Sequence, residues 1–457
     1  RGVEPPASAT ENPPRAAIAR RAAATNVRAA AAARSAGESK RRMRTLVARA
    51  RGAVGGGRGH RVVPAAAVAR EQHLGARRPP AARGIVGETR RGIGGPQLQE
   101  RFDDLPGRVF LVGAHAWATQ VAQGMIVTNM TDHVSWGLYI ANFTFLVGVA
   151  ASAVMLVIPY YLHHYKAFGR ITLLGEFLAV ASVIMCILFI VADLGQPMRL
   201  LNVLLYPTPY SMLFWDMIVL SGYLLLNIVI GFNVLDAERN SVPPADWIKP
   251  LIYLSVPWAV SIHTVTAFLY CGLPGRGFWL TAILAPRFLA SAFAAGPALI
   301  ILLAMIMRKF TKFDAGKEAI QGIARIVTYA LIANVFFFAC EVFVAFYSQI
   351  PGHMDHIKYL FVGLHGHGVL VPWMWSSLGL MLLAIVLLVI PQTRANETFL
   401  AFSCIILFIG IWIDKGMGMI SGGFVPNPLH EVNEYIPTLM EGLIPLGVYA
   451  LGFFVLT

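Results

Sequence analysis

The sequence predicts an all-α integral membrane protein with about nine or ten transmembrane helices. Hydrophobic residues make up 56% of the 457 residues and charged residues only 13%, whereas a soluble domain contains about 25% charged residues. The mean hydropathy is +0.62. The apolar residues also occur in stretches of about 20, the length that a helix needs to cross the ~30 Å hydrocarbon core of a bilayer.

The first quarter of the chain, residues 1–108, differs from the remainder. It holds 22 of the 37 Lys and Arg residues and 8 of the 24 Asp and Glu residues, so the basic character of the chain comes from this segment. Its Arg-, Ala-, Gly- and Pro-rich composition predicts that it forms no packed core. Three interpretations are open: a transit peptide, a basic tail that binds anionic lipid, or sequence that is not native. We assign it no function.

The remainder, residues 109–457, is the predicted transmembrane domain, and its near-neutral charge excludes a nucleic-acid-binding role. We expect helices near 137–162, 171–194, 210–234, 248–271, 287–307, 322–349, 368–391, 398–414 and 436–457. An earlier segment, 109–127, is only moderately apolar and is expected to be the end of a tenth helix. The last stretch stops at Thr457 without a polar tail, which suggests a truncated C-terminus.

Basic residues in alternate loops predict the orientation. One set of loops carries ten Lys and Arg residues. The opposite set carries Arg199, Arg276, Arg287, Lys358 and Lys415. The positive-inside rule places the first set in the cytoplasm. The opposite loops then face outward, and because they are rich in Gly, Pro, His and aromatic residues, we expect a partner protein to dock there.

Polar groups within the predicted helices fall at one level, toward the outward side. They are Tyr139, Asn142, Asp193, Asp216, His263 and Glu341, with Trp136 and Arg199 just outside the helices. Ionisable groups at membrane depth are costly and usually functional. Glu176, at the cytoplasmic end of its helix, is the exception.

Structural alternatives remain open for several of these residues. Asp193 and Arg199 fit a helix-end ion pair, and His263 fits a hydrogen-bonded core histidine. Trp136 fits the aromatic belt at a membrane interface, and Tyr139 and Asn142 fit bonds between helices.

A set of His, Asp, Tyr and Asn at one membrane level suits a quinone head group, whose oxygens need hydrogen-bond donors and a group that exchanges protons near neutral pH. Haem is not expected, because only His263 lies deep in a helix. The four cysteines have no C-x-x-C spacing, so neither zinc nor an iron–sulfur cluster is expected in this chain.

Four segments carry a family resemblance. They are TDHVSWGLYIANFTFLVGVAA, ADLGQPMRLLNVLLYPTPYSML, PWAVSIHTVTAFLYCGLPGRGFW and WIDKGMGMISGGFVPNPLHEVNEYIPT. They resemble the NrfD/PsrC family of quinone-interacting membrane subunits, and most of all the DsrP-type subunit of a sulfite-reduction-associated complex. The resemblance covers roughly 110–457.

This resemblance implies two four-helix bundles with flanking helices in the inner membrane of a bacterium or archaeon. It implies a menaquinone or ubiquinone site near the outer face, no redox metal in this chain, and a docked periplasmic ferredoxin-like iron–sulfur subunit among other electron-transfer partners. By motif position, Tyr139, Asn142, the Asp193–Arg199 segment and His263 would form the site. Asp216 and Glu341 are added from their depth as candidates for proton transfer.

Three functions are therefore compared. The leading hypothesis is a quinol:electron-carrier oxidoreductase subunit that is inactive alone. The second is a proton- or ion-coupled transporter, although transporter sites usually lie near the midplane. The third is a structural anchor, for which the polar groups would be unnecessary.

Overall fold

The computed structural model describes residues 96–456 except 164, 241, 243 and 312. The predictions for residues 1–95 lie outside the described residues. Within the described part, nine helical segments are long and apolar enough to cross a membrane. The protein is thus a multi-pass membrane protein, and the predicted fold class is confirmed.

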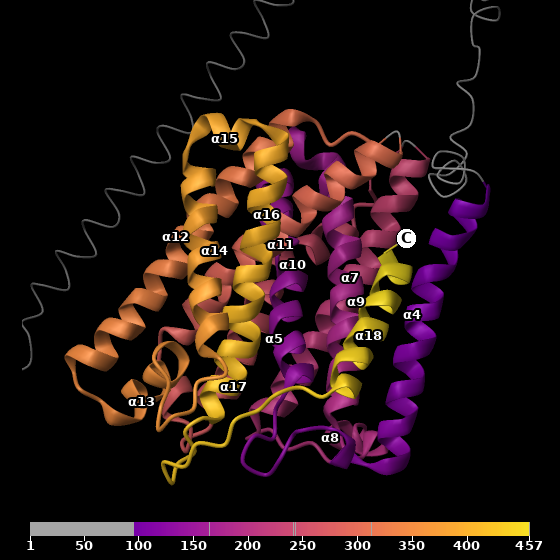
Figure 1. Cartoon of the computed structure of the whole chain (residues 1–457). Coiled ribbons are helices and arrows are strands. Elements are labelled where there is room, and N and C mark those ends of the chain that lie inside the picture. The colour runs from indigo at the N-terminus through magenta and orange to yellow at the C-terminus, as the bar shows by residue number, and fades with distance from the viewer. Residues whose placement is uncertain (1–95, 164, 241, 243, 312, 457) are drawn as a thin grey trace, which may run out of the picture. The chain divides into compact units, whose positions relative to one another are not determined.

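The helices keep close to the predicted ranges. In the labels of Figure 1, the membrane helices are α5 (Leu138–Ala151), α7 (Gly169–Asp193), α9 (Met212–Arg239), α10 (Ile248–Cys271), α11 (Leu284–Phe310), α12 (Lys317–Tyr347), α14 (Val371–Val389), α16 (Glu397–Ile411) and α18 (Leu439–Leu456). The α5 span continues through α6 (Val154–Val157) and the π-helical turn η3 (Ile158–Leu162).

The membrane helices form two four-helix bundles in chain order. Helices α5, α7, α9 and α10 contact one another in a closed ring, and α11, α12, α14 and α16 form a second ring. Helix α11 contacts α5 and α10, and these contacts join the bundles. We call this contact region, with η7 described below, the bundle interface. The expected arrangement is confirmed.

Two further helices flank the first bundle. Helix α4 (Pro96–Gln123) packs along α18, which also contacts α5 and α7. The two helices cross at Gly113 and Gly447, where a Cβ on Gly113 would lie 2.5 Å from the Cα of Gly447. Only glycine at both positions permits so close an approach. The segment expected to end a tenth helix thus belongs to a helix that begins before residue 109, although α4 is not among the nine described helices that are apolar enough to cross a membrane.

The eighth span differs from its prediction. We expected a helix near 398–414 followed by an outward loop. The chain instead continues from α16 through seven π-helical residues, η7 (Trp412–Gly418), into α17 (Met419–Phe424). Glycines allow this irregular segment to pack tightly, since a Cβ on Gly416 would lie 3.3 Å from the backbone oxygen of Ala141.

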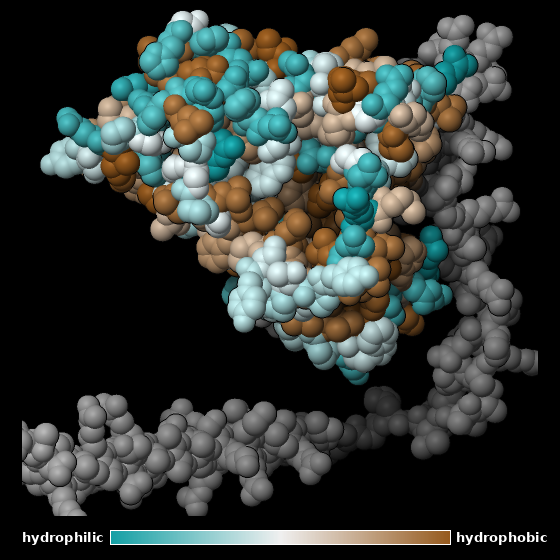
Figure 2. Space-filling model, turned by 90° about the horizontal axis from the view of Figure 1, so that it is seen from below, coloured by the Kyte–Doolittle hydropathy of each residue, from teal (hydrophilic) through white to brown (hydrophobic). Residues whose placement is uncertain are grey.

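The loops gather at opposite ends of the bundles (Figure 1). One end carries α8 (Asn202–Leu205), α13 (Pro351–Phe361) and α17, and the other carries α15 (Pro391–Ala395). We call the first the outer end, following the orientation that the loop charges predict. Figure 2 shows the outer end, where hydrophobic and hydrophilic surface areas alternate.

Candidate functional site

The bundle interface buries ionisable side chains from both bundles. His263 of α10, Arg287 of α11, and Asp414 and Lys415 of η7 are 1%, 7%, 4% and 4% exposed. Glu341 of α12 joins them through Arg287. We call these five residues the interface cluster. Because burying charge in a bilayer is costly, such a cluster indicates a functional site.

Arg287 is the centre of an ion-pair network. Its Nη2 donates to Asp414 Oδ1 at 2.7 Å and Oδ2 at 2.8 Å, and its Nη1 donates to Glu341. The guanidinium also lies 4.9 Å from the ring centre of Phe338. One planar fork thus binds two carboxylates, a geometry that lysine cannot reproduce.

Lys415 enters the same interface from the next residue of η7. Its Nζ lies 3.5 Å from His263 Nε2 and 3.4 Å from the backbone oxygen of Phe288, and 4.4 Å from the Phe288 ring centre. Gly148 of α5 provides space, because a Cβ there would lie 3.2 Å from Nζ. Nδ1 of His263 is buried without a hydrogen-bond partner.

Arg287 and Lys415 were predicted to lie in outward loops, and this prediction was wrong. Both lie inside helical spans, because α11 begins at Leu284 and the last span of the second bundle continues to Phe424. The outer loops retain Arg199, Arg276 and Lys358 of the counted five. The removal of two basic residues from the outer count increases the charge difference on which the predicted orientation depends.

A second polar group lies where α4, α5 and α7 meet. Tyr139 donates from its hydroxyl to Gln120 Oε1 at 2.6 Å, and Gln120 Nε2 donates to the backbone oxygen of Ala192 at 2.7 Å. Asn142, one turn further along α5, accepts from Trp412 Nε1 at 3.0 Å and from the Tyr449 hydroxyl at 2.8 Å. These contacts fit the structural alternative of bonds between helices.

Among the described residues, the predicted acids of the first bundle pair with no cation; Asp216 and Glu176 are buried and Asp193 is partly buried. Asp193 follows Ala192 at the end of α7, and its Oδ1 has no hydrogen-bond partner. No ion pair joins it to the exposed Arg199 within the described residues. Asp216 accepts from Thr266 Oγ1 at 2.6 Å. Both oxygens of Glu176, deeper in α7, are also buried without a partner.

Trp136 packs among other aromatic rings at the outer end. Its ring stacks on Trp279 at a centroid distance of 5.8 Å and meets Tyr270 and Phe424 edge-on. Trp279 in turn donates from Nε1 to the backbone oxygen of Met419 at 2.9 Å. These rings connect the start of α5 to the end of α10 and to α17. Trp373 and Trp375 are exposed.

The structure thus divides the predicted level of polar groups into separate contacts. His263 meets Lys415, Glu341 meets Arg287, and Asp216 meets Thr266. Asp414 and Lys415 were not predicted as site residues. Two charged residues that directly follow a long apolar stretch are the signal that could have identified them.

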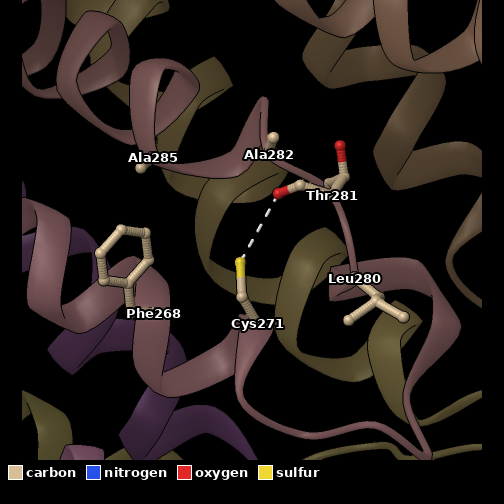
Figure 3. Close-up of a pocket in the computed structure, with 6 residues that line it drawn as sticks. All are labelled: Phe268, Cys271, Leu280, Thr281, Ala282 and Ala285. Carbon is tan, nitrogen blue, oxygen red and sulfur yellow. Dashed lines mark hydrogen bonds between the residues drawn. The ribbon is translucent and has the colours of Figure 1, made fainter. Parts of the chain in front are cut away.

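An apolar pocket of about 250 Å³ lies at the outer end beside α10 and α11. It is lined by Phe268, Cys271, Leu280, Thr281, Ala282 and Ala285. Figure 3 shows the Cys271 thiol directed at the Thr281 backbone oxygen, 3.6 Å away, with Phe268 and Leu280 on either side. Ala285 precedes Arg287 by two residues along α11.

The outer-end helix α13 is held by a buried histidine. His356 Nδ1 lies 2.7 Å from the backbone oxygens of Gly422 and Val425, to which only a protonated nitrogen donates. Burial lowers the pKa of His356 from its ordinary 6.5, and His353 and Arg276 lower it further, while the two hydrogen bonds raise it.

This lowered pKa predicts a pH-dependent stability of the outer end. The folded protein binds a proton at His356 less readily than the unfolded chain does. The contribution of neutral His356 to the free energy of unfolding is therefore fully present above pH 6.5, and it is lost as the pH falls from there through the pKa of the folded state. In this window we expect the free energy of unfolding to fall by up to about 1.4 kcal/mol per pH unit. Thermal unfolding between pH 7.5 and 5 measures it, and His356→Gln is expected to lose this component whereas His365→Gln, in an exposed turn, keeps it. Equal pH dependence in both variants would contradict the assignment.

Comparisons with known proteins agree with this architecture. Residues 126–425 match the family model described as polysulphide reductase, NrfD. The chain is 25% identical over 383 residues to a dimethyl sulfoxide reductase membrane subunit of Halobacterium salinarum, covering 75% of this chain and 86% of the relative. It is 22% identical to a selenate reductase subunit of Mesobacillus selenatarsenatis, covering 74% and 88%.

A third relative carries the word menaquinol in its name. The Hdr-like menaquinol oxidoreductase integral membrane subunit of Archaeoglobus fulgidus is 22% identical over 364 residues, which cover 76% of this chain and 88% of the relative. All three are named as subunits of oxidoreductases. With a family match that spans both bundles and the interface cluster, the chain belongs to the NrfD family of polytopic membrane subunits.

Proposed function

We propose that this chain is the quinone-reactive membrane subunit of a multi-subunit oxidoreductase. Menaquinol or ubiquinol binds near the outer end and delivers two electrons to a docked ferredoxin-like iron–sulfur subunit, or the quinone accepts them in the reverse direction. The interface cluster carries this proposal, because it places an unpartnered His263 Nδ1 in the membrane interior between the two bundles. The DsrP-type likeness and a role in sulfur metabolism remain predictions.

The residues present fit a quinone head group. A quinol offers two hydroxyl groups and a quinone two carbonyl oxygens, and each needs a hydrogen-bond partner in a water-poor site. His263 Nδ1 and Asp193 Oδ1 are buried atoms without such a partner. We assign His263 the exchange of a proton with one oxygen, and Asp193 with Tyr139 the binding of the other.

The surroundings suit the remainder of such a molecule. The pocket at Phe268 and Cys271 exposes mostly carbon, so we place the start of the isoprenoid tail there. At the outer end, the segment 198–210 exposes Met198, Leu201, Leu204, Leu205, Tyr206 and Tyr210. Large exposed apolar groups on one surface favour a docked protein, and we assign the iron–sulfur partner to this surface.

Protons are proposed to leave or enter through the buried acids. Asp216 and Glu341 lie near the outer end, and Glu176 lies 17 residues before Asp193 in α7, about 25 Å along a helix. Glu176 would begin a path from the opposite end of the bundle. Its two oxygens are buried without a partner. The charged carboxylate is costly in such a place, so the group favours the protonated form and can pass a proton on.

The test is quinol-dependent electron transfer in the assembled complex. His263→Ala and Asp193→Asn are expected to lower the rate by about 100-fold, the lower range of general acid–base contributions. His163→Ala and Asp236→Asn, both exposed at the opposite end, are the matched controls. Wild-type rates in the two site variants would show that the site is elsewhere.

The transporter hypothesis has less support. Transporter sites lie near the midplane on broken helices, whereas the interface cluster lies toward the outer end, and the three relatives are named as oxidoreductase subunits. Solute uptake by vesicles that contain only this chain would reverse this preference.

A further inference from the structure

We propose that His263 and Lys415 form an imidazole–amine proton relay, with Lys415 as the group that holds the proton taken from quinol. The inference rests on the proposed function and assigns a role to a lysine in the second bundle. It follows from the geometry of three atoms, His263 Nδ1, His263 Nε2 and Lys415 Nζ.

The two ring nitrogens of His263 have different surroundings. Nε2 faces Lys415 Nζ at 3.5 Å, and Nδ1 is buried without a partner. A ring with one nitrogen open to a ligand and the other against an amine can accept a proton on one side and release one on the other. A histidine with only a structural role would have both nitrogens bonded to fixed groups.

Lys415 is not held by a carboxylate. The adjacent carboxylate, Asp414, is bound through both oxygens by Arg287, while Nζ has only long contacts to His263 Nε2 and to the Phe288 backbone oxygen. The groups that face Lys415 are His263 of α10, Arg287 of α11, the Cys186 thiol of α7 and the neighbouring Asp414 carboxylate of η7. A buried amine without a salt bridge is suited to change its protonation state.

The charges of the interface cluster favour a proton on Lys415. With both carboxyl groups ionised, Arg287, Asp414 and Glu341 together carry one excess negative charge. An ammonium on Lys415 makes the cluster neutral, and a neutral amine leaves the excess uncompensated. Since uncompensated charge is costly in a membrane, the cluster can retain one proton at Nζ.

The local backbone supports a specialised role. Lys415 lies in the π-helical η7, and π-helical turns occur often at functional sites. His263 is 8 residues from the outer end of α10, and Lys415 is 9 residues from the outer end of α17. The two residues therefore occupy corresponding depths in the last span of each bundle, about 12–14 Å from its end.

The proposed step balances as a proton transfer. The step begins with Lys415 as a neutral amine, the state in which the excess negative charge of the cluster is uncompensated. A neutral His263, protonated at Nε2, accepts the proton of a quinol hydroxyl at Nδ1, and its Nε2 proton passes to the lone pair of Lys415 Nζ. The imidazole remains neutral as the other tautomer, and the amine becomes an ammonium ion. The proton of the second quinol hydroxyl leaves through the buried acids of the proposed function, and the two electrons pass to its iron–sulfur partner. In quinone reduction the same proton returns by the reverse path.

Three variants test this relay in the assembled complex. Lys415→Met cannot hold the proton, Lys415→Arg cannot release it, and Gly148→Ala keeps the lysine but places a Cβ 3.2 Å from its present Nζ position. Lys249→Met removes an exposed lysine and is the control. The measurements are the rate of quinol oxidation from pH 5.5 to 9, the protons released in the first turnover, and the binding of a quinol-analogue inhibitor by tryptophan quenching.

We expect Lys415→Met and Lys415→Arg to lower the rate about 100-fold and to lose one pH-dependent limb of the profile. We expect Gly148→Ala to lower the rate about tenfold. Inhibitor affinity should remain within about threefold in all of these variants, because neither Lys415 nor Gly148 contacts the quinol.

Other outcomes separate the two levels of the proposal. Full activity in Lys415→Arg with loss in Lys415→Met would show a fixed positive charge and overturn the relay. Full activity in both would also overturn it. If Lys415→Met fails to assemble, the rate and pH profile of Gly148→Ala decide, and a wild-type profile there overturns the relay. If His263→Ala also retains full activity, the quinol site lies elsewhere, whereas a wild-type complex without quinol-dependent electron transfer would overturn the proposed function itself. If only His263→Ala is inactive, that function survives without the relay.

Discussion

Replacing Arg287 with methionine is expected to lower the free energy of unfolding by about 3–5 kcal/mol, the usual cost of removing one partner of a buried ion pair. The loss is large because one guanidinium binds both Asp414 and Glu341, so its removal leaves two buried carboxylates without a cation. The measurement is the unfolding midpoint of the protein in mixed micelles under graded denaturant.

The same helix provides a control. Arg308 of α11 pairs with Glu397, but their side chains are 30% and 42% exposed, and exposed ion pairs contribute about 0–1 kcal/mol. Arg308→Met should therefore have a small effect. Adding Asp414→Asn and Glu341→Gln to Arg287→Met should recover much of the loss, since no carboxylate is then left buried without a cation. Equal losses for Arg287→Met and Arg308→Met would refute the network as described.

The Glu441→Ala substitution is expected to destabilise the outer end by about 3 kcal/mol or more, because each buried donor that loses its partner costs about 1–3 kcal/mol. Glu441 Oε1 accepts from the Tyr435 hydroxyl at 2.5 Å. Its Oε2 accepts from the backbone N–H groups of Asn129 and Thr438, both at 2.9 Å. The carboxylate therefore joins the loop before α5 to the start of α18.

This contact is also a capping box. Thr438 Oγ1 accepts from the Glu441 backbone N–H at 3.3 Å, while the glutamate accepts from the Thr438 N–H. Hydrogen exchange at the Asn129 and Thr438 amides should rise sharply in Glu441→Ala. The exposed Glu238→Ala should change stability by no more than about 0.5 kcal/mol. Unchanged protection of both amides in Glu441→Ala would contradict this account.

The helical spans could be predicted because their signal is local. Length and hydropathy alone place α7 or α10 within a few residues, since the hydrocarbon core fixes the length of a crossing helix. The pairing of helices into two bundles came from the family resemblance. Nothing in a single apolar helix specifies which neighbour it packs against, because lipid and protein interiors are similarly apolar.

The interface cluster shows where local reasoning failed. Gly416, Gly418 and the following Gly-rich segment resemble a loop in composition, and charged residues beside them are usually solvated. The structure uses these glycines for close helix packing, so Lys415 and Asp414 are buried. Their compensating charge, Arg287, is 127 residues away in sequence from Asp414. A buried charge network over that distance becomes evident only when the fold is known.

The π-helical η7 has a geometrical consequence for the span that contains it. A π-helix bonds each residue to the fifth neighbour instead of the fourth, so its seven residues advance the chain around the axis by less than an α-helix would. The face that α17 presents is thereby rotated relative to the face of α16. In an uninterrupted α-helix each residue turns by about 100°, and a one-residue change of phase would carry the Met419 carbonyl away from Trp279. The segment η7 thus sets the rotation of α17 about the helix axis relative to α16. One half of this span can therefore pack within the second bundle while the other half packs at the bundle interface.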